Sequence, residues 1–90
     1  MKTLEECRKE LDIIDKQVIE LFEKRMNVIK DVALYKKENC LPILDEQREK
    51  VMLETNVKKF KNIGLRKYYK TVLQAFLKTS KQYQKEIIQK

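Results

Sequence analysis

The residues best suited to chemistry in this sequence are charged side chains at positions where a helix would normally place apolar ones. The clearest is Arg25, which interrupts an apolar repeat whose spacings alternate between four and three residues. The repeat consists of Leu4, Cys7, Leu11, Ile14, Val18, Leu21, Val28, Val32 and Tyr35. A buried guanidinium needs an anionic partner. That partner is either a carboxylate of another helix or a bound ligand, and Arg25 alone does not distinguish them.

Two further basic residues flank the same apolar repeat. Arg8 follows Cys7 by one position, and Lys36 follows Tyr35 by one position. Long basic side chains often cover apolar seams with their aliphatic stems, so packing alone would also explain either residue. Arg8 lies more than four helical turns before Arg25, too far for both to hold one small ligand within a chain. In an antiparallel or crossed dimer, Arg8 of one chain could reach Arg25 of the other.

Polar residues also share one face of each of two later segments. Helical spacing places four residues together in the first of these segments: Asp45, Arg48, Glu49 and Met52. Taken alone, this set is better explained by local ion pairs at a solvated helix start. Ser80 and Gln84, one turn apart, interrupt the apolar face of the second segment. Neighbouring groups could satisfy both of these side chains without any ligand.

Taken together, these positions predict a closed, polar and mostly cationic pocket inside a helical assembly. Two arginines at separate points suit a ligand with two carboxylates, each bound in a forked contact. The sequence contains no His and shows no activated nucleophile, metal-binding cluster or glycine-rich phosphate loop. An enzyme built from these residues is therefore expected to use no cofactor and no metal, and to act through orientation and electrostatics.

The elements that must position these residues are predicted to be helices. The sequence has only one Gly and one Pro, so it has few of the turn residues that connect strands. Helix-forming residues are abundant. We expect a long first helix from Thr3 to about residue 37, since Thr3 has capping-box spacing to Glu6 and Pro42 is the first clear stop. A second helix is expected from about 45 to 60 and a third from about 65 to 88.

The length of the first helix predicts a second chain. At about 1.5 Å per residue the helix would be roughly 50 Å long, whereas a compact domain of this size is only about 30 Å across. The remaining residues are too few to cover its apolar repeat. We therefore expect an all-α fold of three helices, one long and two shorter, in an intertwined homodimer.

Composition and charge narrow the class of protein. The 90 residues are expected to form a single domain, residues 1–90, and the net charge of +7 suggests an anionic partner. No apolar run approaches the ~18 residues of a membrane span. Cys7 and Cys40 form no Cys-x-x-Cys pair, and no signal peptide is apparent, so we expect a reduced, cytoplasmic protein.

In combination, these residues resemble the all-helical class of chorismate mutases, of the free-standing, monofunctional type. The resemblance covers nearly the whole chain. It is carried by Arg8 and Asp15, Arg25, Lys36, Pro42, the run Asp45-Glu46-Gln47-Arg48-Glu49, Ser80 and Gln84. It implies conversion of chorismate to prephenate in phenylalanine and tyrosine biosynthesis, in an intertwined homodimer with two equivalent sites.

The resemblance also implies a role for each polar residue of the pocket. Arg25 and Arg8 of the partner subunit would bind the two carboxylates of chorismate. Lys36 and Gln84 would donate hydrogen bonds to the ether oxygen of the breaking bond, and Lys36 would also help to hold a carboxylate.

The remaining matched residues would surround the substrate ring. Glu49 and the backbone near Asp45 would hold the ring hydroxyl, while Arg48 and Ser80 would complete the wall and the carboxylate contacts. Catalysis is thus assigned to Lys36, Gln84, Arg25 and Glu49.

Three alternative functions stay open from the sequence. An isochorismate-pyruvate lyase would share the fold and a similar pocket. A basic helical module that binds nucleic acid or an acidic membrane would not explain why charged residues lie on or beside apolar helix faces. We therefore expect neither nucleic acid nor a membrane as a partner. In the third, the domain would dock on another enzyme of the shikimate pathway.

Overall fold

A computed structural model describes residues 1–89 as three α-helices, with no strand in that range. α1 spans Leu4–Glu38, α2 spans Glu46–Lys58 and α3 spans Arg66–Gln89. A short 3-10 turn, η1 (Ile63–Leu65), precedes α3. The prediction of an all-α chain with one long and two shorter helices is confirmed, and each predicted boundary lies within two residues of the observed one.

Local side chains and backbone geometry set the ends of α1. The Thr3 hydroxyl accepts a hydrogen bond from a backbone N–H of the first turn at 3.1 Å, as its capping spacing predicts. At the other end, Cys40 adopts a left-handed φ of 52°, and the N–H of Leu41 returns to the carbonyl of Lys36 at 2.9 Å. This closure ends α1 before Pro42, so the helix stops slightly earlier than the proline requires.

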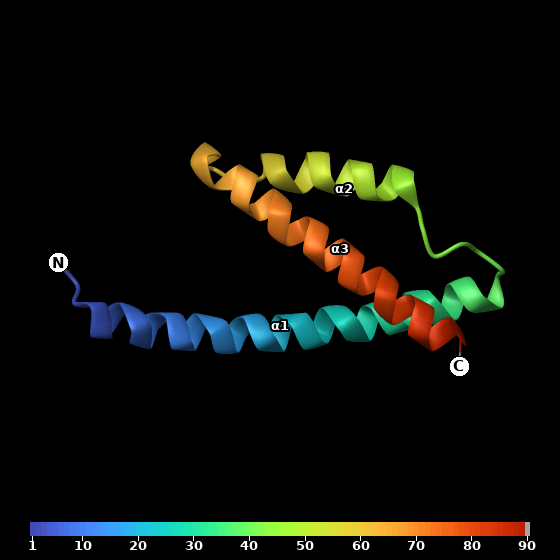
Figure 1. The fold of residues 1–90 in the computed structure, drawn as a ribbon, viewed down its shortest axis with the longest axis horizontal. Coiled ribbons are helices and arrows are strands. Elements are labelled where there is room, and N and C mark those ends of the chain that lie inside the picture. Colours follow the sequence, from blue (N-terminus) through green and yellow to red (C-terminus); the bar gives the residue numbers. More distant parts are fainter. Residues whose placement is uncertain (90) are drawn as a thin grey trace.

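α3 packs against both other helices and holds the chain together. α2 and α3 form a hairpin, and the C-terminal part of α3 crosses the C-terminal part of α1 (Figure 1). The guanidinium of Arg66, at the start of α3, donates to the carbonyls of Lys58 and Phe60 at 3.0–3.2 Å. These bonds satisfy exposed carbonyls at the end of α2 and fix the turn between the two helices.

The core of a single chain is small and lies where α3 meets its neighbours. Its buried apolar side chains are Ala33, Leu73 and Leu77. Two polar side chains, Ser80 and Gln84, are buried beside them with exposed fractions of 4% and 5%. Because these polar groups are buried, their hydrogen-bond partners have to come from neighbouring parts of the chain.

Most of the apolar repeat of α1 is exposed in a single chain. Leu4 is 65% exposed and Ile14 is 49% exposed, and Tyr35, near the other end of the repeat, is 62% exposed. α3 packs along the C-terminal half of α1, from Phe22, whose ring centre lies 6.3 Å from that of Phe76, to Ala33, which is buried on a neighbouring row of the helix. One crossing helix covers a few turns at most, so the N-terminal half of α1 extends beyond the rest of the chain. The radius of gyration is 16.5 Å, compared with about 12 Å for a compact chain of this length.

Residues 1–89 lack two features that are typical of other protein classes. No helix in this range has the length and apolar character needed to cross a bilayer. Nor does the described part of the chain contain a group of three or more His, Cys, Asp or Glu residues placed to hold a metal ion. Cys7 and Cys40 are both free thiols, the first half-buried and the second exposed.

Candidate functional site

A pocket of about 450 Å³, here named the central pocket, lies among the three helices. Its apolar lining consists of Val28, Ile29, Val32, Ile43, Met52 and Leu77. The other lining residues are polar or charged, so the central pocket combines an apolar wall with groups that can fix the orientation of a ligand.

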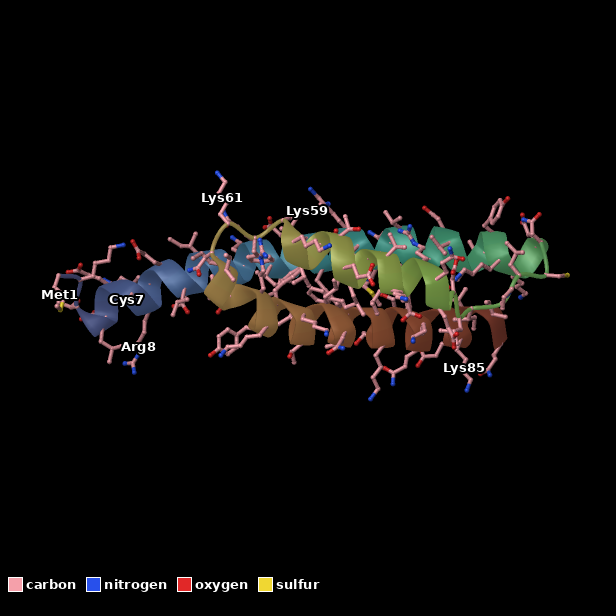
Figure 2. The ribbon with its side chains drawn as sticks, turned by 90° about the horizontal axis from the view of Figure 1, so that it is seen from above. Met1, Cys7, Arg8, Lys59, Lys61 and Lys85 are labelled. Atoms are coloured by element: carbon pink, nitrogen blue, oxygen red, sulfur yellow. The ribbon has the colours of Figure 1, made fainter. Side chains whose placement is uncertain are left out.

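Seven of the eight predicted site residues line the central pocket: Arg25, Lys36, Asp45, Arg48, Glu49, Ser80 and Gln84. Residues that lie up to 59 positions apart in the sequence are therefore brought together by the crossing of α3 over α1 and by the α2–α3 hairpin. The eighth residue, Arg8, is exposed on the extended N-terminal part of α1 (Figure 2). It lies about 25 Å along the helix axis from Arg25 and does not reach the central pocket of its own chain.

Arg25 is held from α3. Its Nη1 donates to the hydroxyl of Ser80, and its guanidinium carbon lies 5.5 Å from the centre of the Phe76 ring. The Ser80 hydroxyl in turn donates to the Phe76 carbonyl at 2.7 Å, which fixes its orientation. Arg25 forms no salt bridge with a carboxylate among the described residues. The internal salt bridge that the sequence left open is therefore not formed among residues 1–89.

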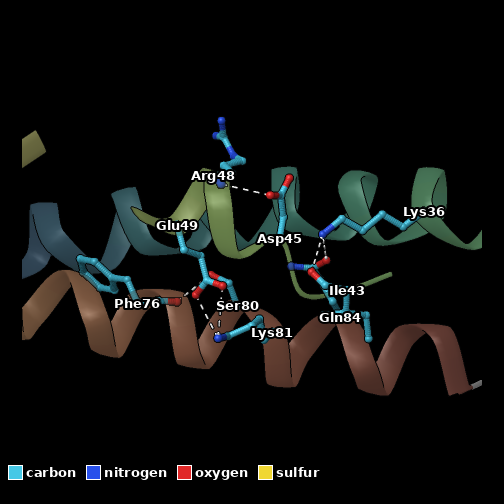
Figure 3. Close-up of polar contacts among 9 residues, drawn as sticks. All are labelled: Lys36, Ile43, Asp45, Arg48, Glu49, Phe76, Ser80, Lys81 and Gln84. Atoms are coloured by element: carbon cyan, nitrogen blue, oxygen red, sulfur yellow. Dashed lines mark hydrogen bonds and ion pairs between the residues drawn. The ribbon is translucent and has the colours of Figure 1, made fainter. Parts of the chain in front are cut away.

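Lys36 and Gln84 form the second polar cluster of the central pocket (Figure 3). The ammonium of Lys36 donates to the Gln84 Oε1 at 3.0 Å and to the backbone carbonyl of Ile43 at 2.8 Å. These bonds fix the ammonium between α1, α3 and the loop that leads to α2. Because Gln84 accepts through its oxygen, its amide nitrogen is available to donate to a ligand.

Asp45 and Arg48 lie at the edge of the pocket, where α2 begins. The carboxylate of Asp45 caps α2 by accepting from the backbone N–H of Arg48 at 3.0 Å. The guanidinium of Arg48 points away from the α3 side of the site (Figure 3) and is exposed. Asp45 thus has a clear structural role, and Arg48 lies on the rim.

Glu49 has a partner that the sequence analysis did not single out. Its carboxylate forms an ion pair with Lys81 of α3, with 2.9 Å between Lys81 Nζ and Oε1. Lys81 also lines the central pocket. Local ion pairs at the start of α2 were one explanation for the charged residues there. Glu49 instead pairs with a lysine of α3.

The charge of the central pocket is positive. Its lining includes four cations, Arg25, Lys36, Arg48 and Lys81, and two carboxylates, Asp45 and Glu49. One of these carboxylates caps a helix and the other is paired with Lys81. Arg25 and Lys36 form no salt bridge with a carboxylate among the described residues, and the central pocket has a volume suited to a small molecule.

Comparison with known proteins identifies similar sequences. The family model of chorismate mutase type II matches residues 7–85. The chorismate mutase of Methanocaldococcus jannaschii is 30% identical over 95 residues, covering 99% of this chain and 91% of that protein. No solved structure gives a significant match to the chain.

Other relatives are larger proteins. The bifunctional chorismate mutase/prephenate dehydratase of Buchnera aphidicola from Schizaphis graminum is 34% identical over 85 residues, and the match covers 92% of this chain. The T-protein of Haemophilus influenzae is 37% identical over 54 residues, covering 60% of this chain. The chain spans only 22% and 14% of the lengths of these two proteins.

Proposed function

Because the chain belongs to the chorismate mutase type II family, we propose that it converts chorismate to prephenate in the central pocket. The observation that carries this proposal is the convergence of Arg25, Lys36 and Gln84 on one pocket with an apolar wall. This donor set suits a dianion whose reaction needs positioning and charge stabilisation. The proposed product is a precursor of phenylalanine and tyrosine.

The reaction places two requirements on the site. It is a one-step rearrangement in which the flexible enolpyruvyl side chain must first be held over the ring, so restricting its motion lowers an entropic barrier. Negative charge then gathers on the ether oxygen as the carbon–oxygen bond breaks. Fixed donors beside that oxygen stabilise the transition state more than the ground state.

We propose that Lys36 and Gln84 donate hydrogen bonds to the ether oxygen of the substrate. Two of the three ammonium hydrogens of Lys36 are engaged by Ile43 and Gln84, which leaves one for the substrate. The amide nitrogen of Gln84 supplies a second donor from the opposite helix. Both groups are anchored before substrate binds, so little reorganisation is needed during the reaction.

We assign one substrate carboxylate to Arg25, which Ser80 holds in place. Arg8 of the partner subunit would bind the other carboxylate, and Arg48 would close the rim. Glu49, with the backbone near Asp45, would accept the ring hydroxyl. These roles follow from the family resemblance and from the positions of the side chains around the central pocket.

The proposal includes a homodimer. It is supported by the exposed apolar repeat of α1 and by the distance between Arg8 and the central pocket of its own chain. We propose that residues 1–90 form one mutase domain and that the protein lies in the reducing cytoplasm, a location that the two free thiols, Cys7 and Cys40, support. Docking on another enzyme of the pathway is a further proposed partnership, because a relative is a bifunctional chorismate mutase/prephenate dehydratase.

The direct test is incubation of the purified protein with chorismate. We expect chorismate absorbance to fall and prephenate to be identified as the product, without added cofactor or metal. Parallel incubation with isochorismate distinguishes the lyase of the same fold, which would release pyruvate. Pyruvate from isochorismate with no prephenate from chorismate would reject the mutase assignment.

The neutral amide of Gln84 leads to a prediction about pH. Since an amide does not titrate near neutrality, we expect the wild-type kcat to be nearly flat around pH 7. In Gln84→Glu, only the protonated carboxyl can donate to the ether oxygen, so kcat should fall as pH rises and the carboxyl ionises. Neighbouring Lys36 favours the ionised form and so extends this loss toward acid pH. Steady-state kcat from pH 5 to 8 tests this, and a steep loss in the wild type would contradict the role of Gln84.

A further inference from the structure

We propose that Lys81 is a positioning residue, which fixes the Glu49 carboxylate in the central pocket and cancels its charge toward a dianionic substrate. This inference rests on the proposed function, because it assigns Lys81 a task in the same site. Lys81 would act through Glu49 and not on the reacting atoms.

The geometry of the pair supports this assignment. Lys81 Nζ lies 2.9 Å from Oε1 of Glu49 and 3.4 Å from Oε2, so the ammonium faces both carboxylate oxygens. The side chain of Glu49 is only 21% exposed and that of Lys81 is 37% exposed. The contact joins α2 to α3 across the central pocket (Figure 3), and the carboxylate keeps free lone pairs with which to accept a hydroxyl.

The charge of the substrate explains why Glu49 needs such a partner. A half-buried carboxylate close to a dianion raises the free energy of binding through repulsion, which a low local dielectric strengthens. Lys81 offsets this repulsion while leaving Glu49 able to accept a hydrogen bond. The site can then recognise a ring hydroxyl with a charged acceptor and still bind two carboxylates.

The placement of Lys81 on α3 distinguishes it from the surface lysines of the same helix. It lies one turn after Leu77 and nearly one turn before Gln84, both of which are buried and line the central pocket. Lys78 and Lys85 are exposed and are absent from the lining. Lys85 projects away from the other helices (Figure 2) and therefore offers a matched control with the same charge.

A double-mutant cycle tests the coupling between the two side chains. We expect Lys81→Met to lower kcat/KM about tenfold, mainly through a higher KM, since residues in contact commonly couple to this extent. In a Glu49→Gln background, where there is no charge to cancel, the same substitution should change kcat/KM by less than about twofold. Equal losses in both backgrounds would overturn the proposal.

Two further variants separate positioning from stability. Lys81→Arg keeps the charge and should restore kcat/KM to near the wild-type value, whereas Lys85→Met should have no effect. Thermal unfolding, followed by circular dichroism, measures separately how much the contact between Lys81 and Glu49 contributes to stability. If Lys81→Arg stays as impaired as Lys81→Met, or if Lys85→Met causes the same loss, Lys81 does not act through its contact with Glu49.

Crystal structures of the substrate-free wild-type and Lys81→Met proteins provide a test that does not depend on turnover. We expect the Glu49 carboxylate to leave the central pocket for solvent in the variant. An unchanged Glu49 would overturn the positioning role. Failure of the wild type to convert chorismate would instead reject the proposed function, while this structural comparison would still report on Lys81.

Discussion

Replacing Lys36 by alanine is expected to lower kcat by about 10²–10³-fold, the usual cost of losing one fixed donor to developing negative charge. The ammonium is oriented in advance by the carbonyl of Ile43 and by Gln84. Its removal takes away both the donor and the positive charge nearest to the proposed ether oxygen. Because the interaction strengthens as the bond breaks, the loss should appear in kcat more than in KM.

Steady-state kinetics with chorismate measures this effect, and two further variants define its cause. Lys37→Ala removes a neighbouring lysine that is exposed and absent from the pocket lining, so its kcat should stay unchanged. Lys36→Met keeps the aliphatic stem and should be as inactive as Lys36→Ala. Circular dichroism should show all three variants folded, and a kcat near the wild-type value in Lys36→Ala would reject the assignment.

The apolar periodicity of the sequence was sufficient to predict the helices but not which row of α1 meets α3. An apolar repeat marks the side chains that avoid water, but it does not identify the surface that covers them. In the described chain, Arg25 in the repeat contacts Ser80 of α3 and Ala33 on a neighbouring row is buried, while Leu11 and Ile14 of the repeat stay exposed. The repeat was expected to need a second chain, and in one chain its N-terminal half forms an open surface, whereas Arg25, Val28 and Val32 line the central pocket.

The candidate site was predictable where polar residues interrupt apolar positions. Arg25, Ser80 and Gln84 stand out in this way, and all three line the central pocket. Lys81 did not stand out because α3 carries several other lysines, two of them at positions 78 and 85. Its spacing from Leu77 and Gln84 was the available signal. The ion pair with Glu49 depends on the α2–α3 hairpin and could not be read from spacing within one helix.

The exposed repeat and the distant Arg8 have the same physical explanation in a dimer. A helix segment that contacts nothing gains little from its own backbone hydrogen bonds, and its apolar side chains favour burial. Pairing with a second α1 would bury the repeat and could carry Arg8 toward the partner's central pocket. Folding of the N-terminal half of α1 and completion of the site would then be one event.

Mixing two inactive variants tests this link between dimerisation and catalysis. Arg8→Ala and Arg25→Ala should each lower kcat/KM by about a hundredfold, because each removes charge-assisted hydrogen bonds to a substrate carboxylate. When the two variants are unfolded together in equal amounts and refolded, half of the dimers are expected to be mixed. Each mixed dimer has one site with both arginines and one with neither, so activity should recover to about a quarter of the wild-type value.

A second mixture shows whether the recovery depends on residues from different chains. Arg25 and Lys36 line the same pocket of one chain, so mixing Arg25→Ala with Lys36→Ala leaves every site lacking one of them and should restore nothing. Recovery in the first mixture alone would assign Arg8 to the partner's site. If the first mixture stays at the average of its two components, Arg8 acts within its own chain or not at all. The dimer would then be needed for stability and not for substrate binding.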